Sequence, residues 1–492
     1  MRILAHFNIQ MRLSSAESLP ARGGITEVCA PQRPTYPRDS LSPSVVHIGL
    51  GSFHRSHQAA YFDELAQASG PRWGIVAASL RCRQVVDALV AQDGLYTVLA
   101  RGSHGESARI IGSLIDCLFG PDDPLRLLAA LSDPRTRLVT LTITGDGYAA
   151  PGPRRDPRHW TVWDYFVEAL ARRRRSGVQP FTILSCDNIP ANGDAARNAL
   201  VSVATGRDEV LARWIERTVA FPESMVDRIT PATGTEEEGY VQRAYGVEDR
   251  CPVVTEPFSQ WVIADDFCNE KPPLDVVGVR FVSDVKPYSL MKRRLLNAGH
   301  SALGYLGALA GHRWTDEAMG NHAIRRYLEA LMHEEIAPLL PRVPGIDLLS
   351  YQRSVIERFS NGAVRDPLER LCGRGSTKMP AYLIPSIWEA SRRGSQRDLL
   401  AVALAAWIRY LRGTDLTARP MAIKDARVEE LQPLALKGGS DPRPLLAQRD
   451  IFGDLIEDGV FVAALERSLA ELDHGGVEGV VSSIASATSN AA

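Results

Sequence analysis

Two kinds of segment alternate between residues 45 and 285, and this alternation constrains the fold more than any other feature. Short apolar runs rich in β-branched residues are typical of buried strands. Such runs occupy residues 45–50, 74–79, 95–100, 137–144 and 181–186. Amphipathic segments with helical spacing lie between several of them. Because strands that alternate with helices form a mostly parallel sheet covered by helices, the sequence predicts an open, doubly wound α/β domain.

The pattern changes near residue 285. After residue 286 the strand-like runs nearly vanish, and long helical patterns follow, such as 323–340 and 396–413. We therefore expect a mostly α-helical second domain. The predicted domains are an N-terminal extension over 1–44, the α/β domain over 45–285 and the helical domain over 286–492.

The sequence contains no pattern typical of a membrane-spanning, secreted or nucleic-acid-binding protein. The net charge of -2 offers no basic surface for nucleic acid, and no apolar run approaches the roughly 18–20 residues of a membrane helix. Seven scattered cysteines without a C-x-x-C pair favour a reducing compartment. The N-terminus has no signal-peptide core, and Met11 is an alternative start to Met1. We expect a cytoplasmic protein.

A glycine turn follows the first predicted strand. In "GLGSFHRSHQAAY", Gly49 and Gly51 form G-x-G between a strand and a helix, where a dinucleotide pyrophosphate binds in many α/β proteins. His54 stands where the third glycine of this fingerprint would fall, and Arg55 is a candidate phosphate contact. Histidines 47, 54 and 57 crowd this turn, but no acidic or thiol ligand is interleaved, so we predict no metal site.

The residue that ends the second strand commonly distinguishes NAD from NADP. A carboxylate there accepts the ribose 2′-OH, whereas an arginine suits a 2′-phosphate. This chain has "LRCRQ", with Arg81 and Arg83 and no acid. These arginines are either surface residues at a helix start or part of a site that accepts NADP.

A second polar loop follows the predicted strand 181–186. Its sequence, "SCDNIPANGDAA", places Asp187, Asn188, Asn192 and Gly193 at a strand end, where open α/β sheets bind ligands. An asparagine amide can stabilise a developing alkoxide, as an oxyanion-hole donor does. A polar turn with a helix cap would use the same residues, and the loop alone does not separate the two interpretations.

The segment "KRRLLNAGHSALGYLG", residues 292–307, sets Lys292, Asn297 and His300 among apolar residues. At about 100° per residue, His300 lies about 80° and Asn297 about 140° from Lys292, so one broad helix face can present all three. Burial lowers the pKa of a lysine amine and makes it a competent general base near neutral pH. We expect Arg293 and Arg294 to be exposed.

Taken together, these stretches resemble the polyol-specific long-chain dehydrogenases, the mannitol dehydrogenase family. The matching segments, in order between about residues 45 and 415, are "VHIGLGSFHRSHQA", "TITGDGY", "SCDNIPANG", "FPESMVDRITP", "EPFSQWVI", "KRRLLNAGHSALGYLG" and "ERFSN". The resemblance implies a Rossmann-type N-terminal domain, a helical C-terminal domain and an active site between them. It also implies metal-independent hydride transfer between NAD(P) and a sugar C2 hydroxyl or ketone.

The resemblance also implies roles by position. Lys292 resembles the general acid/base of the family, Asn188 and Asn297 the two amides that polarise the reacting oxygen, and His300 the substrate-orienting histidine. The implied substrate contacts are Arg370 and Lys378. The implied cofactor contacts are Gly49, Gly51, Phe53, His54, Arg55 and Asp227, the last lining the nicotinamide end of the site.

The chain departs from the family at Gly145 and Ser289, where the family usually has glutamates. We expect NAD, with NADP possible, and a mannitol/fructose reaction by a monomer or weak oligomer. Because Arg370 could also hold a carboxylate, a hexuronate reductase acting on fructuronate or tagaturonate is the alternative. The missing glutamates raise a third possibility, a non-catalytic NAD(P)-binding sensor.

Overall fold

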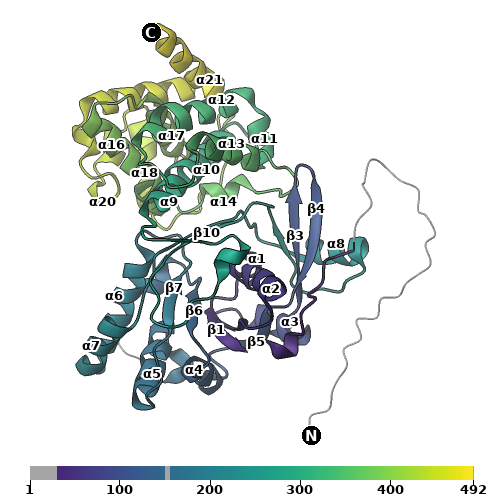
Figure 1. The fold of residues 1–492 in the computed structure, drawn as a ribbon. Coiled ribbons are helices and arrows are strands. Elements are labelled where there is room, and N and C mark those ends of the chain that lie inside the picture. The colour runs from purple at the N-terminus through teal and green to yellow at the C-terminus, as the bar shows by residue number, and fades with distance from the viewer. Residues whose placement is uncertain (1–29, 150–155, 491–492) are drawn as a thin grey trace, which may run out of the picture. The chain divides into compact units, whose positions relative to one another are not determined.

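The computed structural model describes residues 30–149 and 156–490, with side chains as far as residue 481. Its contacts divide the chain into two compact units, Met1–Val285 and Lys286–Ala492. In Figure 1 the first unit runs from purple to teal and the second from green to yellow. Residues 1–29 of the predicted N-terminal extension, with both candidate start methionines, lie outside the described residues.

A five-stranded parallel sheet organises the first unit. Its strands, in spatial order, are β5 (Leu114–Phe119), β2 (Gly74–Ser79), β1 (Pro43–Ile48), β6 (Leu138–Leu141) and β7 (Thr182–Ser185). Every neighbouring pair is parallel. The chain builds outward from β1 first through β2 and β5, and then in the opposite direction through β6 and β7. This reversal confirms the predicted doubly wound α/β fold and sets a switch point between β1 and β6, where such sheets bind ligands.

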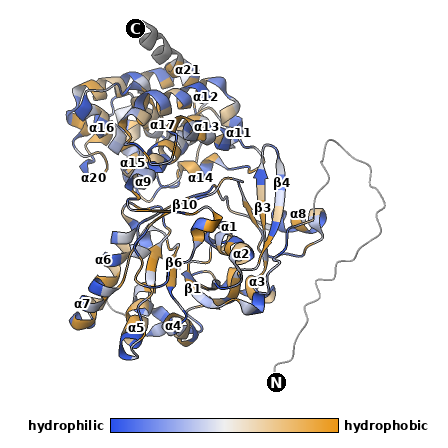
Figure 2. Ribbon diagram, in the orientation of Figure 1, coloured by the Kyte–Doolittle hydropathy of each residue, from blue (hydrophilic) through white to orange (hydrophobic). Residues whose placement is uncertain are grey.

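Helices cover both faces of this sheet (Figure 1). On one face α4 (Pro124–Ser132), α5 (Val162–Arg175), α6 (Asn192–Thr205) and α7 (Glu209–Thr218) pack against a buried cluster that includes Val46 and Ile48. On the other face α2 (Gln58–Ser69) and α3 (Arg83–Ala91) pack against a cluster that includes Val45 and Ile75. β1 is buried on both sides, so its sequence, PSVVHI, is mostly apolar and does not alternate as a half-exposed strand would. The covering helices α5 and α7 show both hydrophobic orange and hydrophilic blue in Figure 2.

One of the predicted strands lies outside the parallel sheet. The run 95–100 lies in β3 (Tyr96–Gly102), which pairs with β4 (Gly105–Ile111) and β9 (Val253–Thr255) in a separate sheet covered by α8 (Thr235–Tyr245). A third sheet contains β8 (Ser224–Asp227), β10 (Gln260–Ala264) and β11 (Arg280–Val282). The sequence pattern identifies β3 as a strand but does not identify its partners. The sequence did not predict β5, because the charged Asp116 interrupts its apolar run, "LIDCLF".

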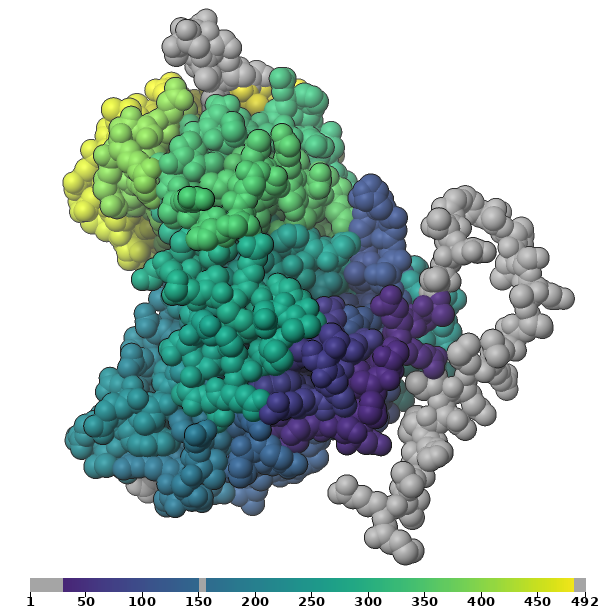
Figure 3. All heavy atoms as spheres, viewed as in Figure 1, coloured from purple at the N-terminus to yellow at the C-terminus, as the bar shows by residue number. Residues whose placement is uncertain are grey.

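The second unit is built from helices around two buried ones, as predicted. These two are α10 (Ala298–Leu309) and α17 (Asp398–Tyr410). The others are α9 (Lys286–Met291), α11 (Thr315–Gly320), α12 (His322–Ala330), α13 (Leu348–Phe359), α14 (Leu368–Cys372), α15 (Gly375–Tyr382), α16 (Ile384–Arg393), α18 (Val428–Gly438), α19 (Arg443–Leu446), α20 (Arg449–Phe452) and α21 (Gly459–Asn490). Figure 3 shows this unit, green to yellow, as a closely packed body. Among the described residues, none of the helices has the length and apolar character needed to cross a bilayer.

Two six-residue segments of the second unit are π-helical, and the sequence predicted neither. They are η5 (Lys292–Asn297) and η6 (Leu331–Ile336). In η6, Glu335 is buried and its two carboxylate oxygens accept the N–H groups of Leu399 and Leu400, at 2.9 and 2.8 Å. Glu335 therefore satisfies free donors at the start of α17. Burial raises the pKa of Glu335 to about 7.

We expect Glu335 to make stability depend on pH. Its folded pKa of about 7 exceeds the ordinary glutamate value of 4.5, so the folded state holds this proton more tightly than the unfolded state does. The stabilisation is complete below about pH 4.5 and is lost as the pH rises through 7. Relative to Glu335→Gln, the wild type should lose on the order of 2–3 kcal/mol of unfolding free energy between pH 5 and pH 8. Urea unfolding at both pH values measures this, and parallel pH profiles would contradict it.

Candidate active site

The two glycines of the turn after β1 are there for different reasons. Gly49 has φ +110°, and a Cβ on it would lie 2.1 Å from the carbonyl oxygen of Thr142, so the fold itself requires glycine. Its N–H donates to Ala78 O at 2.9 Å, which ties the turn to the end of β2. A Cβ on Gly51 would meet only Gly49 O, at 3.9 Å. The protein leaves open space at Gly51, as a close approach of ligand to backbone requires.

His54 takes a role that the third glycine of the fingerprint usually has. It lies in α1 (Ser52–Ser56), is buried, and stacks on His47 of β1 with ring centroids 3.3 Å apart and planes 8° from parallel. Nδ1 of His47 is 2.8 Å from Thr140 Oγ1. Burial lowers the pKa of His47 to about 3 and that of His54 well below its usual range. Two neutral imidazoles thus hold α1 against the strand.

Phe53 and Arg55 make contacts with the protein itself. Phe53 is half-buried and stacks on His57 with centroids 5.0 Å apart. The buried Arg55 donates to the carbonyl of Cys251 and lies over the Tyr96 ring, 5.5 Å from its centroid. These contacts fasten the turn to neighbouring segments, and a phosphate contact by Arg55 stays a prediction. The described residues contain no cluster of His, Cys, Asp or Glu that could hold a metal ion.

Asp187 organises the loops at the carboxyl ends of β6 and β7. Its carboxylate accepts the N–H groups of Ile143 and Thr144, at 3.0 and 2.9 Å, and the hydroxyl of Tyr148 at 2.7 Å. These bonds join the loop containing Gly145 to the loop that presents the exposed Asn188. Asp187 therefore positions Asn188, although the sequence did not distinguish their roles.

Two further polar residues of this unit are placed by the fold. Asn192 is buried, and its amide donates to the carbonyls of Ser185, Asp187 and Ser224 and accepts the N–H of Ser224. All its hydrogen-bonding groups serve the loop, so its role is structural. Asp227 is buried at the end of β8, opposite Gln260 of β10. Its place at the nicotinamide end of a cofactor stays a prediction.

In the second unit, Lys292 and Asn297 bound the π-helix η5, between α9 and α10. A π-helix joins residue i to residue i+5 and takes more residues per turn than an α-helix, so Lys292 and Asn297 lie nearer to the same side than α-helical geometry would put them. The predicted separation of about 140° is wrong for this segment because it assumed α-helical geometry. His300 follows in α-helical geometry, about 60° from Asn297. The wide turn therefore brings the three polar residues closer to one line than the sequence suggested.

The environments of these three residues suit proton transfer and orientation. Lys292 is only 5% exposed, whereas Asn297 and His300 are half-buried. The His300 ring stacks on Phe359, with centroids 4.3 Å apart, and its buried Nε2 has no hydrogen-bond partner among the described residues. Burial, and then the nearby Arg370, hold the pKa of His300 well below its usual value. The ring is therefore a neutral imidazole with a polar atom available to a ligand.

Arg370 and Lys378 lie near His300 but are held by other groups. The Arg370 guanidinium pairs with both carboxylate oxygens of Asp366, with Nε 2.6 Å from Oδ1. Nζ of Lys378 donates to the carbonyls of Arg370 and Leu371, at 3.1 and 2.9 Å. Burial, and then Arg370, lower the pKa of Lys378 to about 8. Asp366 fixes the orientation of Arg370, and no motif in the sequence indicated this aspartate.

The two arginines after Lys292 differ from the sequence prediction. Arg294 is 9% exposed and forms an ion pair with Glu389 of α16. Arg293 is half-buried, and its Nε donates to Ser289 O at 3.3 Å. The prediction of an exposed basic turn is therefore wrong, because a carboxylate on a distant helix compensates the buried charge of Arg294.

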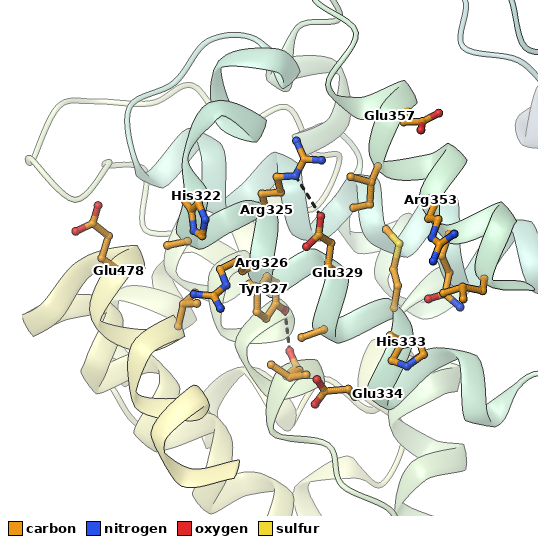
Figure 4. Close-up of a pocket in the computed structure, with 18 residues that line it drawn as sticks. His322, Arg325, Arg326, Tyr327, Glu329, His333, Glu334, Arg353, Glu357 and Glu478 are labelled. Carbon is orange, nitrogen blue, oxygen red and sulfur yellow. Dashed lines mark hydrogen bonds and ion pairs between the residues drawn. The ribbon is translucent and has the colours of Figure 1, made fainter. Parts of the chain in front are cut away.

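A separate cavity of about 1140 Å³ opens among α12, η6, α13 and α21 (Figure 4). Charged side chains line much of it, and Arg325 is paired with Glu329 at 3.1 Å. None of the predicted site residues of the second unit lines this cavity. The candidate site, the polar helix face around Lys292, therefore lies outside this cavity.

Two family models cover most of the chain. The mannitol dehydrogenase Rossmann domain matches residues 43–276, and the mannitol dehydrogenase C-terminal domain matches residues 284–473. The chain belongs to the mannitol dehydrogenase family. It is therefore an oxidoreductase, and the resemblance inferred from its motifs is confirmed.

Mannitol dehydrogenases of several organisms are similar to this chain along most of their length. Mannitol dehydrogenase 2 of Saccharomyces cerevisiae is 44% identical over 89% of this chain and 91% of its own length. The mannitol 2-dehydrogenase of Emericella nidulans is 40% identical over 90% of this chain and 93% of its own length.

Two solved structures of this kind share the fold. A ternary complex of Pseudomonas fluorescens mannitol 2-dehydrogenase with NAD and D-mannitol has a TM-score of 0.83 and 38% identity, covering 92% of this chain and 96% of that one. A substrate-free D-sorbitol dehydrogenase has a TM-score of 0.82 and 31% identity, covering 92% and 97%.

Proposed function

We propose that this chain is an NAD(P)-dependent, metal-independent polyol 2-dehydrogenase that interconverts mannitol and fructose. The observation that carries this proposal is the buried Lys292 at the start of a π-helix that ends at Asn297, followed in α10 by His300 with its unpartnered Nε2. Mannitol dehydrogenases about 40% identical to this chain support the choice of substrate. We assign nucleotide binding to residues 45–285 and substrate binding with proton transfer to residues 286–492.

The residues around the switch point fit a dinucleotide. The open space at Gly51 admits a pyrophosphate to the backbone, and the fixed turn at Gly49 places that backbone beside the end of β2. We assign Phe53 to the wall of this site and Asp227 to its nicotinamide end. When bound, the nicotinamide supplies the acceptor or donor of the hydride.

In polyol oxidation, the neutral amine of Lys292 accepts the proton of the C2 hydroxyl at Nζ while C2 loses its hydride. The amides of Asn188 and Asn297 donate to the oxygen as its negative charge grows. In ketose reduction, the Lys292 ammonium returns the proton to the same oxygen. His300 orients a neighbouring hydroxyl, and we assign the more distant hydroxyls to Arg370 and Lys378.

One observation favours a second substrate class. After burial, four basic side chains contribute to the lowered pKa of His300, namely Arg370, which is paired with Asp366, and Arg358, Lys378 and Lys292. Such a concentration of positive charge suits a carboxylate on the substrate. A hexuronate reductase, acting on fructuronate or tagaturonate, is therefore the second candidate function.

A substrate panel tests the proposal. NADH and NADPH are each combined with fructose, xylulose, fructuronate and tagaturonate, and oxidation is followed at the nicotinamide absorbance. We expect fructose to be reduced with the highest kcat/KM. Turnover of keto-uronates alone would replace the mannitol proposal with the second candidate. Cofactor binding without turnover of any substrate would instead indicate a non-catalytic NAD(P) sensor.

The two glycines of the turn give a prediction about cofactor binding. Gly51→Ala should leave the thermal unfolding midpoint nearly unchanged, since its Cβ meets no protein atom within 3.9 Å. It should weaken NADH binding by about tenfold or more, because the methyl group occupies the space of the pyrophosphate. Gly49→Ala is the contrasting variant, because the Thr142 carbonyl lies 2.1 Å from its Cβ, so we expect destabilisation. Equal NADH affinity in Gly51→Ala and the wild type would contradict the assignment.

A further inference from the structure

The end of β2 lies directly beside the glycine turn. Ile48 of β1 is in register with Ala78 of β2, and Gly49 donates to Ala78 O at 2.9 Å. Ser79 ends the strand one residue later. In a Rossmann-type domain this position faces the adenosine ribose, where a carboxylate accepts the 2′-OH and an arginine accommodates a 2′-phosphate. Residues 79–83 therefore lie where the two cofactors are told apart.

This chain has no carboxylate between residues 79 and 86. The first acid is Asp87, whose carboxylate lies 3.8 Å from Arg83. The hydroxyl of Ser79 accepts the N–H groups of Cys82 and Arg81, at 2.9 and 3.4 Å. Because these bonds occupy the hydroxyl in closing the turn, the segment lacks the acceptor that usually selects the 2′-OH of NAD.

The two arginines of this turn differ in their partners. Arg83 forms an ion pair with Asp122, and its guanidinium lies over the Phe119 ring, 5.0 Å from the centroid. Arg81 is exposed, and its guanidinium has no hydrogen-bond or ion-pair partner among the described residues. The acids of the neighbouring loop after β5 are already engaged, Asp122 by Arg83 and Asp123 by the N–H of Arg126. Arg81 thus presents an exposed guanidinium at the ribose position.

We infer, building on the proposed dehydrogenase function, that Arg81 binds the 2′-phosphate of NADP(H) and that this chain binds NADP(H) at least as tightly as NAD(H). A guanidinium offers two parallel N–H donors that match phosphate oxygens. No acid stands in this segment to repel the phosphate. Arg81 is accordingly a specificity-determining residue that acts on the cofactor and not on the sugar.

Binding measurements separate this inference from catalysis. Isothermal titration with adenosine 2′,5′-bisphosphate and with 5′-AMP isolates the 2′-phosphate, and fluorescence titration with NADPH and NADH extends the comparison to whole cofactors. Arg81→Ala should weaken binding of the bisphosphate and of NADPH by about 10- to 100-fold. It should change 5′-AMP and NADH binding by less than about threefold, because neither ligand carries the group. Arg81→Glu should reverse the preference toward NADH.

Arg83→Ala is the matched control. It removes the same charge only two residues along the chain, and the Arg83 guanidinium is already paired with Asp122. We expect little change in NADPH affinity there. A wild type that binds NADH more tightly than NADPH would overturn the inference. If Arg83→Ala lost as much NADPH affinity as Arg81→Ala, the inference would also be overturned, because the effect would then come from local positive charge and not from Arg81 itself. If both cofactors bind as inferred but no sugar is turned over, the proposed function fails while the inference stands.

Discussion

Lys292→Ala should reduce kcat by about 10³- to 10⁴-fold while leaving cofactor affinity close to that of the wild type. The amine is the proposed acceptor of the substrate proton. His300 on the same helix face is a poor replacement, because burial holds its pKa well below the usual value. Lys292→Met, which keeps the length and volume of the side chain, should lose as much activity with less effect on packing at this 5% exposed position. Steady-state kinetics with fructose, together with NADH titration, measures both quantities.

The exposed Lys437 supplies a matched control, because Lys437→Ala removes the same group from the surface and should keep full activity. Added ethylamine should restore part of the activity of Lys292→Ala by filling the site of the lost amine. Near-normal turnover in a correctly folded Lys292→Ala protein would remove Lys292 from the mechanism.

Asn188→Ala and Asn297→Ala should each lower kcat by about 10²- to 10³-fold, with smaller changes in KM. Each amide is proposed to stabilise charge that develops on the reacting oxygen, so its loss matters most in the transition state. Asn269→Ala, whose amide donates to the Pro180 carbonyl at 3.0 Å, serves as the control for loss of an asparagine.

The double variant Asn188→Ala/Asn297→Ala tests whether the two amides act together. If both donate to one oxygen, its loss in kcat should be smaller than the product of the two single losses. A strictly multiplicative loss would mean that they act independently. Normal kcat in either single variant would remove that amide from the mechanism.

The fold was predictable because its main signals are local. The short, mostly apolar runs of β1, β2, β6 and β7 do not alternate between polar and apolar residues, and this pattern indicates a parallel sheet covered on both faces regardless of distant partners. The run that became β3 shows the limit of such signals. Its pattern is that of a buried strand, but its partners, β4 and β9, are a hairpin neighbour and a segment about 150 residues away.

The candidate site was predictable in its residue types but not in its geometry. The polar triad of Lys292, Asn297 and His300 stands out against an apolar helix, yet no sequence period shows that the turn containing the lysine is π-helical. Arg294 appeared exposed because its partner, Glu389, lies 95 positions later. His54 appeared to break the glycine fingerprint, because stacking on His47 depends on the fold and not on spacing. The roles of the individual residues stay predictions until the variants are measured.

The π-helical turn within residues 286–309 limits how this helix can be engineered. Converting it to regular α-helix would improve its backbone hydrogen bonds, but we expect the change to abolish activity. The π-helical turn contains one residue more than an α-helical turn. Deleting that residue would rotate the helix after it by about 100° relative to the helix before it. Either the buried Leu303 and Leu306 would leave the core, or Lys292 would leave its proposed position beside the substrate. Thermostabilising libraries should therefore hold Lys292–Asn297 and its length fixed, and insertions or deletions there should be scored as losses of function even where the protein melts at a higher temperature.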